Sequence, residues 1–545
     1  MLSFFPNLSI WIGAFISFII PFGSSWLFHH ISNYHFSKKK SKKTKTSPEE
    51  ISDNNAFEST KHLQDKLKIL KKSISHSPDV IFRQFRISNS DWEAAIIYID
   101  GLVDKTVLQE QILKPLMGKQ SFIEHSSPTI SDVKIALTES VISIGEVKKE
   151  LCLNTCILEI LSGNAVLLID NAAEALILGI IGGASRSIET PSSEDVVRGP
   201  RDGFTETLRT NTSLIRRRIK DPNLTMVNYK VGQRTQTNLS LIYIKGLTNH
   251  ELVKEIQQRI ERIDIDEMTE SGFIEQLIED NYLTPFPQMQ HTERPDRVVS
   301  ALIEGRVTLL LDGTPFALIA PVTFSMLMTS SEDYYERWIP TSLIRILRYG
   351  AAFIALFLPS LYIALISYNH GLIPTKLVMS IAAGREGVPF PSIVEGLIME
   401  IILEILREAG LRLPKQIGQT IGIVGGLVIG QAAVQAGIVS PIMVIVVALT
   451  AISSFTCPQY SVGITIRTLR FGMMIMSAIF GLYGIILCYI FIMNHLVKLK
   501  SFGVNYLSPF APYRPDDWKD SLIRMPLKTM KSRPKANKTQ DNKRQ

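Results

Sequence analysis

The sequence lacks the residue patterns that most enzymes and metal proteins use. Its four cysteines, Cys152, Cys156, Cys457 and Cys488, have neither the spacing of a zinc site nor the density of a disulfide framework. The ten histidines are scattered, and no Ser-His-Asp, Cys-His or HExxH arrangement is present. We therefore expect no enzyme activity, no metal and no cofactor. The few cysteines also suit a reducing, cytoplasmic compartment for the soluble N-terminal region, which we call the head.

Charged residues are also scarce, and apolar residues are unevenly distributed. Charged side chains make up 20% of the 545 residues and hydrophobic ones 46%, which is more apolar than a typical soluble protein. The region from Lys38 to Arg306 has the mixture of a water-soluble α/β protein, whereas Gly350 to Met493 contains runs long enough to cross a bilayer. The sequence thus predicts a soluble α/β head followed by an α-helical multi-span membrane domain.

Segments as long as a bilayer is thick, and free of Asp, Glu, Lys and Arg, mark the membrane domain. These expected spans are Tyr349 to Ser367, Ile417 to Ala436, Ile438 to Phe455 and Phe471 to Met493. An even number of crossings puts the head and the basic C-terminal tail on the same, cytoplasmic side by the positive-inside rule. Arg467 and Arg470 fit less well because this count leaves them outside, so one crossing between Leu372 and Leu413 would change the topology.

The net charge of +7 lies mainly near the two ends of the chain. Six lysines fall between Lys38 and Lys45, and twelve Lys or Arg stand against four Asp from Asn494 to Gln545. This distribution favours an anionic membrane surface over nucleic acid. The apolar stretch from Ile10 to Phe28 is either a membrane anchor with its lysines in the cytoplasm or an interfacial helix.

An internal repeat divides the soluble head. IIYIDGL (Ile96 to Leu102) matches LIYIKGL (Leu241 to Leu247), and GNAVLLID (Gly163 to Asp170) matches GRVTLLLD (Gly305 to Asp312) at nearly the same offset. Each first piece reads as a strand followed by a helix, and each second piece as a strand that turns at its Asp into another strand. The head is therefore expected to contain two duplicated α/β subdomains, with Asp170 and Asp312 at equivalent turns.

These features predict six regions along the chain. They are an apolar N-terminal segment at 1–30, a basic polar linker at 31–76, α/β subdomains at 77–200 and 201–335, a transmembrane helical domain at 336–495, and a basic cytoplasmic tail at 496–545.

Two arginine-containing stretches in the head are candidates for contacts. VVRGPRDGFTE (Val196 to Glu206) has a Gly-Pro turn flanked by Arg198 and Arg201, which could bind a phosphate or carboxylate or form a charged turn between subdomains. It lacks the glycine-rich loop and lysine of a nucleotide site. NTSLIRRR (Asn211 to Arg218) is expected to be a helix with a solvated or subunit-contacting face, because it has no aromatic residues to stack nucleic-acid bases.

A stripe of glycines marks a packing surface in the membrane domain. Gly418, Gly422, Gly426 and Gly430 recur every four residues, so they lie on one face of a helix and allow a neighbouring backbone to approach closely. The neighbouring helix belongs either to the same subunit or to another one.

An acidic amphipathic helix is expected between Pro391 and Pro414. Glu400, Glu404 and Glu408 follow one another at i+4 steps, with Glu395 before them. Carboxylates at membrane depth are costly unless they face water, and a ring of them from several subunits would attract cations. The helix therefore either lines an ion path or lies at the interface with its acids paired to nearby bases. Those bases would be Arg407, Arg412 and Lys415.

Several long motifs, in order, resemble the A subunit of spore germination receptors, the GerA family. The similarity extends from about Ser77 to Pro526, and the apolar segment before it departs from the family pattern. The motifs are VVRGPRDGFTE (Val196 to Glu206), PFPQMQHTERPDRV (Pro285 to Val298), DYYERW (Asp333 to Trp338), REAGLRLPKQIGQTIGIVGGLVIGQAAV (Arg407 to Val434) and SSFTCPQY (Ser453 to Tyr460).

This resemblance implies a function and a set of partners. It implies a multi-pass subunit of a nutrient germinant receptor in the inner membrane of the dormant endospore, with its head on the core side. The expected partners are a transporter-like B subunit and a lipoprotein C subunit. The resemblance further implies a homo-oligomeric ring, a pentamer, that forms a germinant-gated ion channel; a non-conducting scaffold for the sensing subunits is the alternative. It carries over no catalytic residue.

Overall fold

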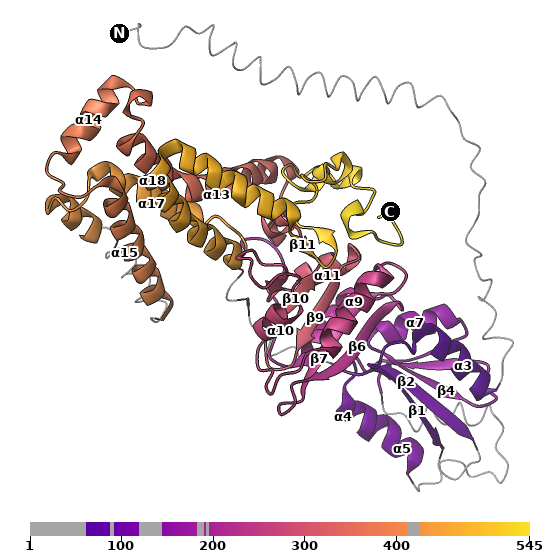
Figure 1. Cartoon of the computed structure of the whole chain (residues 1–545). Coiled ribbons are helices and arrows are strands. Elements are labelled where there is room, and N and C mark those ends of the chain that lie inside the picture. Colours follow the sequence, from indigo (N-terminus) through magenta and orange to yellow (C-terminus); the bar gives the residue numbers. More distant parts are fainter. Residues whose placement is uncertain are drawn as a thin grey trace, which may run out of the picture. The chain divides into compact units, whose positions relative to one another are not determined.

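The computed structural model describes residues 62–87, 92–118, 144–182, 190–191, 194, 196–412, 426 and 428–544. The predicted N-terminal segment at 1–30 and nearly all of the linker at 31–76 lie outside these residues. Between residues 62 and 322 the chain forms two mixed α/β subdomains, drawn in indigo to magenta in Figure 1.

The first subdomain is a five-stranded antiparallel sheet in the order β1-β2-β4-β5-β3. Its strands are β1 (Val80–Arg86), β2 (Glu93–Ile99), β3 (Val147–Glu150), β4 (Ala165–Ile169) and β5 (Ala175–Leu178). Its helices are α3 (Leu63–Ile74), the turns α4 (Lys105–Val107), η2 (Leu108–Leu113) and α5 (Lys114–Met117), and α7 (Leu153–Ser162). Alternate residues of β2 point to opposite faces, so Ile97 packs with α3 and α7 whereas Ile96 packs with the helical turns from α4 to α5.

The second subdomain repeats this plan strand for strand, in the order β6-β7-β9-β10-β8. Its strands are β6 (Leu224–Val231), β7 (Thr237–Ile244), β8 (Gln290–Thr292), β9 (Val307–Leu311) and β10 (Ala317–Ala320). Its helices are α8 (Leu208–Arg218), α9 (His250–Glu261), α10 (Ser271–Ile278) and α11 (Pro295–Ile303). α8 and α11 cover one face of this sheet, and α9 and α10 cover the other.

The two pairs of matching sequence segments occupy equivalent elements. IIYIDGL contains the end of β2 and LIYIKGL the end of β7, while GNAVLLID contains β4 and GRVTLLLD contains β9. Asp170 accepts a hydrogen bond from Leu63 N (2.8 Å), and Asp312 accepts one from Leu208 N (2.9 Å). Each aspartate thus caps the first turn of the equivalent helix, so the predicted duplication is confirmed in these residues.

Three regions differ from the sequence expectations. The linker was expected to run to residue 76, but α3 packs into the first core through Leu67 and Leu70, because its apolar residues recur at helical spacing. The arginines of α8 join the two subdomains: Arg216, 2% exposed, binds Asp79 at 2.8 Å across them. The basic tail at 496–545 was expected to be a separate region, yet its Phe502 is buried in the core of the second subdomain.

The helical domain follows the head after α12 (Phe324–Leu327) and η4 (Ser331–Tyr334). Its helices are α13 (Trp338–Ser367), α14 (Thr375–Arg385), α15 (Ser392–Arg412), α17 (Pro441–Ser454) and α18 (Tyr460–Lys498). The tail adds the hairpin β11 (Lys500–Ser501) and β12 (Val504–Asn505) and the short turns η6 (Pro515–Asp520), η7 (Leu527–Thr529) and η8 (Lys535–Asn537).

Among the described residues, two helices, α13 and α18, are long and apolar enough to cross a membrane. The expected span from Tyr349 to Ser367 lies inside α13. The span expected from Ile438 to Phe455 contains α17, whose 14 residues reach only about 21 Å, short of a hydrocarbon core of about 30 Å. Half of the span from Ile417 to Ala436 lies outside the described residues. The expected count of four spans is therefore not confirmed.

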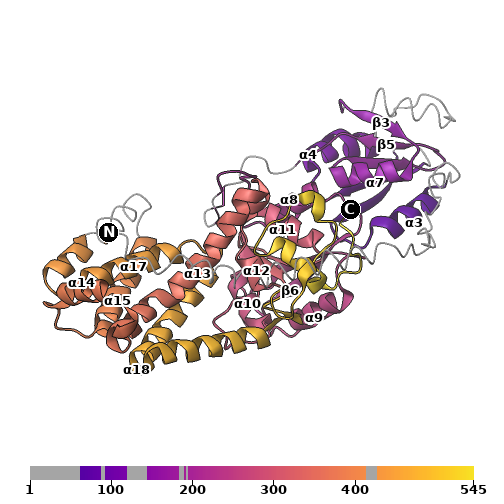
Figure 2. The same ribbon diagram turned by 90° about the horizontal axis from the view of Figure 1, so that it is seen from above.

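The fourth expected span, Phe471 to Met493, lies inside α18 but is not one straight crossing, because α18 reverses direction at Gly481. Thr465 donates to Pro285 O, and the neighbouring Thr284 bonds His495 Nε2 at 2.7 Å. In a straight helix residues 465 and 495 would be about 45 Å apart. Gly481 has φ 61° and ψ −140°, a conformation open to glycine, so α18 consists of two legs that both lead back toward the second subdomain (Figures 1 and 2).

Candidate functional site

A buried ion pair joins α15 to the first leg of α18. Arg470 Nη2 lies 2.7 Å from Glu400 Oε2, and the two side chains are 2% and 1% exposed. An ion pair this deeply buried is stable only when both charges are present, since either charge alone would be left without compensation. Glu400 was a candidate for the ion path, and its partner was not foreseen from the sequence.

Glu404, one turn along α15, extends this pair into a cluster. It lies 2.8 Å from Arg407, 3.6 Å from Arg467 and 3.8 Å from Arg470. We call the set Glu400, Glu404, Arg407, Arg467 and Arg470 the charge cluster. Of the two acids in the cluster, Glu400 is buried and Glu404 is 32% exposed, so Glu404 is the one that reaches solvent-accessible space. Two carboxylates face three guanidinium groups, which leaves one net positive charge.

Glu408 lies outside the charge cluster. It is 62% exposed and pairs with Arg412 at 2.7 Å. Two of the expected pairs between acids and bases of this helix are therefore present, Glu404 with Arg407 and Glu408 with Arg412. Lys415 lies outside the described residues.

A second buried pair fixes the start of α15. Glu395 is fully buried, lies 2.8 Å from Arg385 of α14, and accepts a hydrogen bond from Ser440 N at the start of α17 (2.9 Å). Tyr362 of α13 bonds Ser440 Oγ at 3.2 Å. Arg385 and Arg470 lie next to apolar runs, and the cost of a charged residue at membrane depth was the signal that could have revealed both pairs.

The glycine stripe is described at two of its four members. Around Gly426 no atom of the described chain lies within 4 Å of the position that a Cβ would take, whereas a Cβ at Gly430 would lie 3.4 Å from Val444 of α17. Gly418 and Gly422 lie outside the described residues. Gly430 therefore packs within the chain, and the face at Gly426 is open with respect to the described residues.

Arg198 and Arg201 lie on an exposed turn near the start of the helical domain. Arg198 is 68% exposed and lies 4.0 Å from Glu336, and Arg201 is exposed. Between them, Gly199 has φ 136°, and a Cβ there would come within 2.7 Å of the Tyr335 ring. The turn thus packs against the segment that leads into α13, and the two arginines do not converge on one point.

A polar cavity of about 300 Å³ lies where the head meets the helical domain. Its lining includes Glu194, Gln290, Arg294 and Arg297 from the head, together with Arg348, Cys457 and Gln459. Arg294, 1% exposed, donates to Pro200 O at 2.9 Å. Gln459, the residue before α18, donates to His291 O at 3.1 Å. Burial raises the pKa of Glu194 to about 7.

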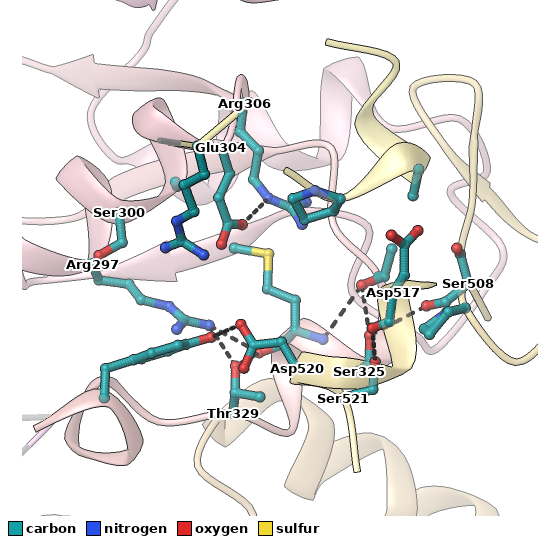
Figure 3. Close-up of a pocket in the computed structure, with 18 of the residues that line it drawn as sticks. Arg297, Ser300, Glu304, Arg306, Ser325, Thr329, Ser508, Asp517, Asp520 and Ser521 are labelled. Atoms are coloured by element: carbon teal, nitrogen blue, oxygen red, sulfur yellow. Dashed lines mark hydrogen bonds and ion pairs between the residues drawn. The ribbon is translucent and has the colours of Figure 1, made fainter. Parts of the chain in front are cut away.

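A second cavity, of about 270 Å³, separates the head from the tail (Figure 3). Arg297, Glu304 and Arg306 line it from the head side, and Asp517 and Asp520 line it from η6. Asp520 also accepts a hydrogen bond from Arg345 of α13 at 3.0 Å. Charged groups of the head and the tail therefore line one cavity, and Asp520 connects the tail to α13.

In the described part of the chain no group of three or more His, Cys, Asp or Glu could hold a metal ion.

Comparisons with known proteins agree with these features. A family model described as Bacillus/Clostridium GerA spore germination protein matches residues 68–536. Spore germination protein KA of Bacillus subtilis (strain 168) is 46% identical over 476 residues, 87% of this chain and 86% of that protein. The membrane protein YfkQ of the same organism is 46% identical over 485 residues, 89% of this chain and 93% of that protein.

A solved structure is also similar. The N-terminal domain of the A subunit of the Bacillus megaterium spore germinant receptor GerK3 is 35% identical, covers 49% of this chain and 96% of that domain, and has a TM-score of 0.39. The family match extends over the two subdomains, the helical domain and most of the tail. The chain belongs to the GerA family of spore germination proteins.

Proposed function

We propose that this chain is the A-type membrane subunit of a nutrient germinant receptor that triggers spore germination. Membership of the GerA family and the name of spore germination protein KA support the germination role. The name of YfkQ and the two long apolar helices support a place in a membrane. The membrane is the inner membrane of the endospore, and the partners are a transporter-like B subunit and a lipoprotein C subunit.

The chain is a multi-pass protein whose head and tail lie on the same, cytoplasmic side. α13 starts at the head, and the second leg of α18 ends at Thr284 of the head, so the helices between them cross an even number of times. The exposed lysines after this leg, Lys498 and Lys500, favour the cytoplasmic side.

Within the receptor, the subunit forms a ring, a pentamer, that conducts ions when germinant binds. The observation that supports conduction best is the charge cluster, since charges inside a membrane domain are costly and commonly mark ion paths. In the arrangement described, guanidinium groups neutralise Glu404, which corresponds to a closed state. Moving Arg467 and Arg470 away from α15 would leave two carboxylates, Glu400 and Glu404, with Arg407 alone. The site would then carry one net negative charge, and a ring of such sites would attract cations.

The contact between head and α18 supplies the coupling. Gln459 holds the start of α18 to Gln290 and His291 of the head, and Arg467 follows about two helical turns later. A displacement of the head would therefore move Arg467 relative to Glu404. This path needs no flexible connection, because each step is a hydrogen bond or a rigid helix.

A non-conducting scaffold is the second candidate, and the open face at Gly426 favours it as much as it favours a ring. Large apolar side chains of the helices, among them Phe353, Ile452 and Phe480, are also exposed in the single chain. Such surfaces suit lipid or neighbouring subunits in either case. The scaffold differs in one respect: the charge of Glu404 has no part in ion movement.

Spores that carry a Glu404→Gln variant test the two candidates. The amide keeps the size of the side chain while removing its charge, so ion release after germinant addition is expected to fall several-fold with normal receptor levels. The matched control is Glu386→Gln, a substitution outside the charge cluster. Unchanged ion release and germination rate in the Glu404 variant would support the scaffold and contradict conduction.

A further inference from the structure

The loop between α10 and β8 exposes two large apolar residues beside the end of α18. Tyr282 and Leu283 are 81% and 77% exposed. The next residue, Thr284, bonds His495 of α18 at 2.7 Å, so the pair lies where the second leg leaves its apolar stretch and meets the head. Exposed apolar residues that stand together at such a place mark a contact surface.

Basic residues border the same loop. A cavity of about 410 Å³ is lined by Asn281 from the loop and by His495, Lys498 and Lys500 from the end of α18 and its extension. Its acidic lining residues, Glu255 and Asp280, both pair with Arg259. One guanidinium group offsets one of these two carboxylates, so with the exposed Lys498 and Lys500 the group carries one net positive charge.

We propose that this surface, which we call the interfacial loop (Asn281 to Thr284 with Lys498 and Lys500), docks into the headgroup region of the bilayer and binds anionic phospholipid. Tyrosine is favoured at this depth because its ring is apolar and its hydroxyl polar. Lysines near the surface attract lipid phosphates. The loop lies beside the end of α18, so the bilayer that surrounds this helix would also be the nearest partner for the loop.

The interfacial loop gives the head a second attachment to the membrane, apart from its chain connection. β8 begins a few residues after Thr284, and its Gln290 is bonded to Gln459 at the start of α18. Lipid held at the loop therefore fixes the same segment that couples the head to the charge cluster. The inference rests on the proposed membrane insertion, which the experiment below tests separately.

Tryptophan quenching in the full chain tests this docking. A Tyr282→Trp variant is placed in vesicles of anionic lipid brominated near the headgroup, and the emission of the parent's five tryptophans is subtracted. We expect at least half of the added emission to be quenched. Leu158→Trp, on the 50% exposed Leu158 of α7, is expected to remain unquenched, and Phe353→Trp, on the 60% exposed Phe353 of α13, to be quenched most by lipid brominated deep in its chains.

The outcomes separate the inference from the function on which it rests. Quenching at Phe353→Trp without quenching at Tyr282→Trp overturns the docking and leaves insertion intact. No quenching at either site contradicts both. A Tyr282→Trp emission that is protected from a water-soluble quencher but not quenched by brominated lipid shows a protein occupant, which also overturns the proposal.

The lysines are tested by lipid charge. Lys498→Gln with Lys500→Gln, made in the Tyr282→Trp chain, is expected to reduce quenching in anionic vesicles to the level seen in zwitterionic vesicles. The matched control is Lys528→Gln with Lys531→Gln, two exposed lysines elsewhere in the tail. Equal quenching in anionic and zwitterionic vesicles before any lysine is changed would remove the anionic headgroup from the proposal.

Discussion

Glu400 and Arg470 form an ion pair that is almost fully enclosed by the helical domain, with 2.7 Å between Oε2 and Nη2. The pair fixes α15 against the first leg of α18, and Glu404 beside it is the carboxylate that remains partly accessible. Arg407 belongs to α15 and stays beside Glu404, so the position of Arg467 and Arg470, and therefore of α18, decides whether the charge cluster is positive or negative overall.

Removing one partner of this pair should destabilise the helical domain strongly. We expect Glu400→Ala to lower the free energy of unfolding in detergent by about 3–5 kcal/mol, because the buried Arg470 loses its partner at 2.7 Å and keeps only Glu404 at 3.8 Å. Glu400→Leu combined with Arg470→Met should recover most of this loss. The control is Glu408→Ala at an exposed pair, where a change within about 1 kcal/mol is expected. Equal effects at Glu400 and Glu408 would contradict the burial of the pair.

The reversal of α18 should depend on Gly481. A Gly481→Ala substitution forces a side chain into a positive φ and places its Cβ 3.2 Å from the Tyr368 side chain, so we expect a loss of stability of about 1–3 kcal/mol. Gly472→Ala is the matched control, since Gly472 is helical and exposed and no described atom is within 4 Å of its Cβ position. It should be neutral or slightly stabilising. Thermal unfolding of both variants gives the comparison.

The glycine stripe should separate assembly from folding. Gly426→Leu adds a side chain to an open face of the single chain, so it should reduce the oligomer size in detergent without affecting membrane insertion. Gly430→Leu would press on Val444 within the chain and should lower stability instead. An unchanged oligomer in the Gly426 variant would remove this face from the subunit contact.

The stability of the head should fall as pH rises through neutrality. Burial, reinforced by Glu279 and Glu270, raises the pKa of Glu275 to about 8. The folded head therefore binds this proton more tightly than the unfolded chain, so the stabilisation is complete below about pH 4.5 and is lost by about pH 8. Glu275→Gln should flatten this part of the profile of melting temperature against pH. A variant with the parent's slope would show that Glu275 titrates normally.

The repeat in the head was predictable because its evidence is local. Each matched strand is a β-branched run ending at Gly or Asp, and such runs specify both strand and turn. The same residues carry a role that was not foreseen, since Asp170 and Asp312 each bond the first residue of a helix more than a hundred positions earlier in sequence. A partner at that distance is set by the fold, not by spacing.

The helical domain was harder to predict, for two physical reasons. Hydropathy shows how apolar a segment is, but it does not show whether the helix runs straight or turns back. The reversal of α18 depends on the single glycine Gly481 within an apolar run. The acids of α15 were compared with bases on the same helix, whereas Glu400 and Glu395 are neutralised by Arg470 and Arg385 from other helices. Long-range pairing of charges across a bundle leaves no periodic signal in the sequence.

Cation flux from vesicles that contain the chain with its B and C subunits tests the central claim most directly. Germinant should release cations from vesicles with the parent chain, and Glu404→Gln should reduce that release several-fold while Glu386→Gln leaves it unchanged. Replacing Glu404 with Lys should shift the preference toward anions. Equal germinant-dependent flux in the parent and Glu404→Gln chains, with equal assembly, would contradict the account.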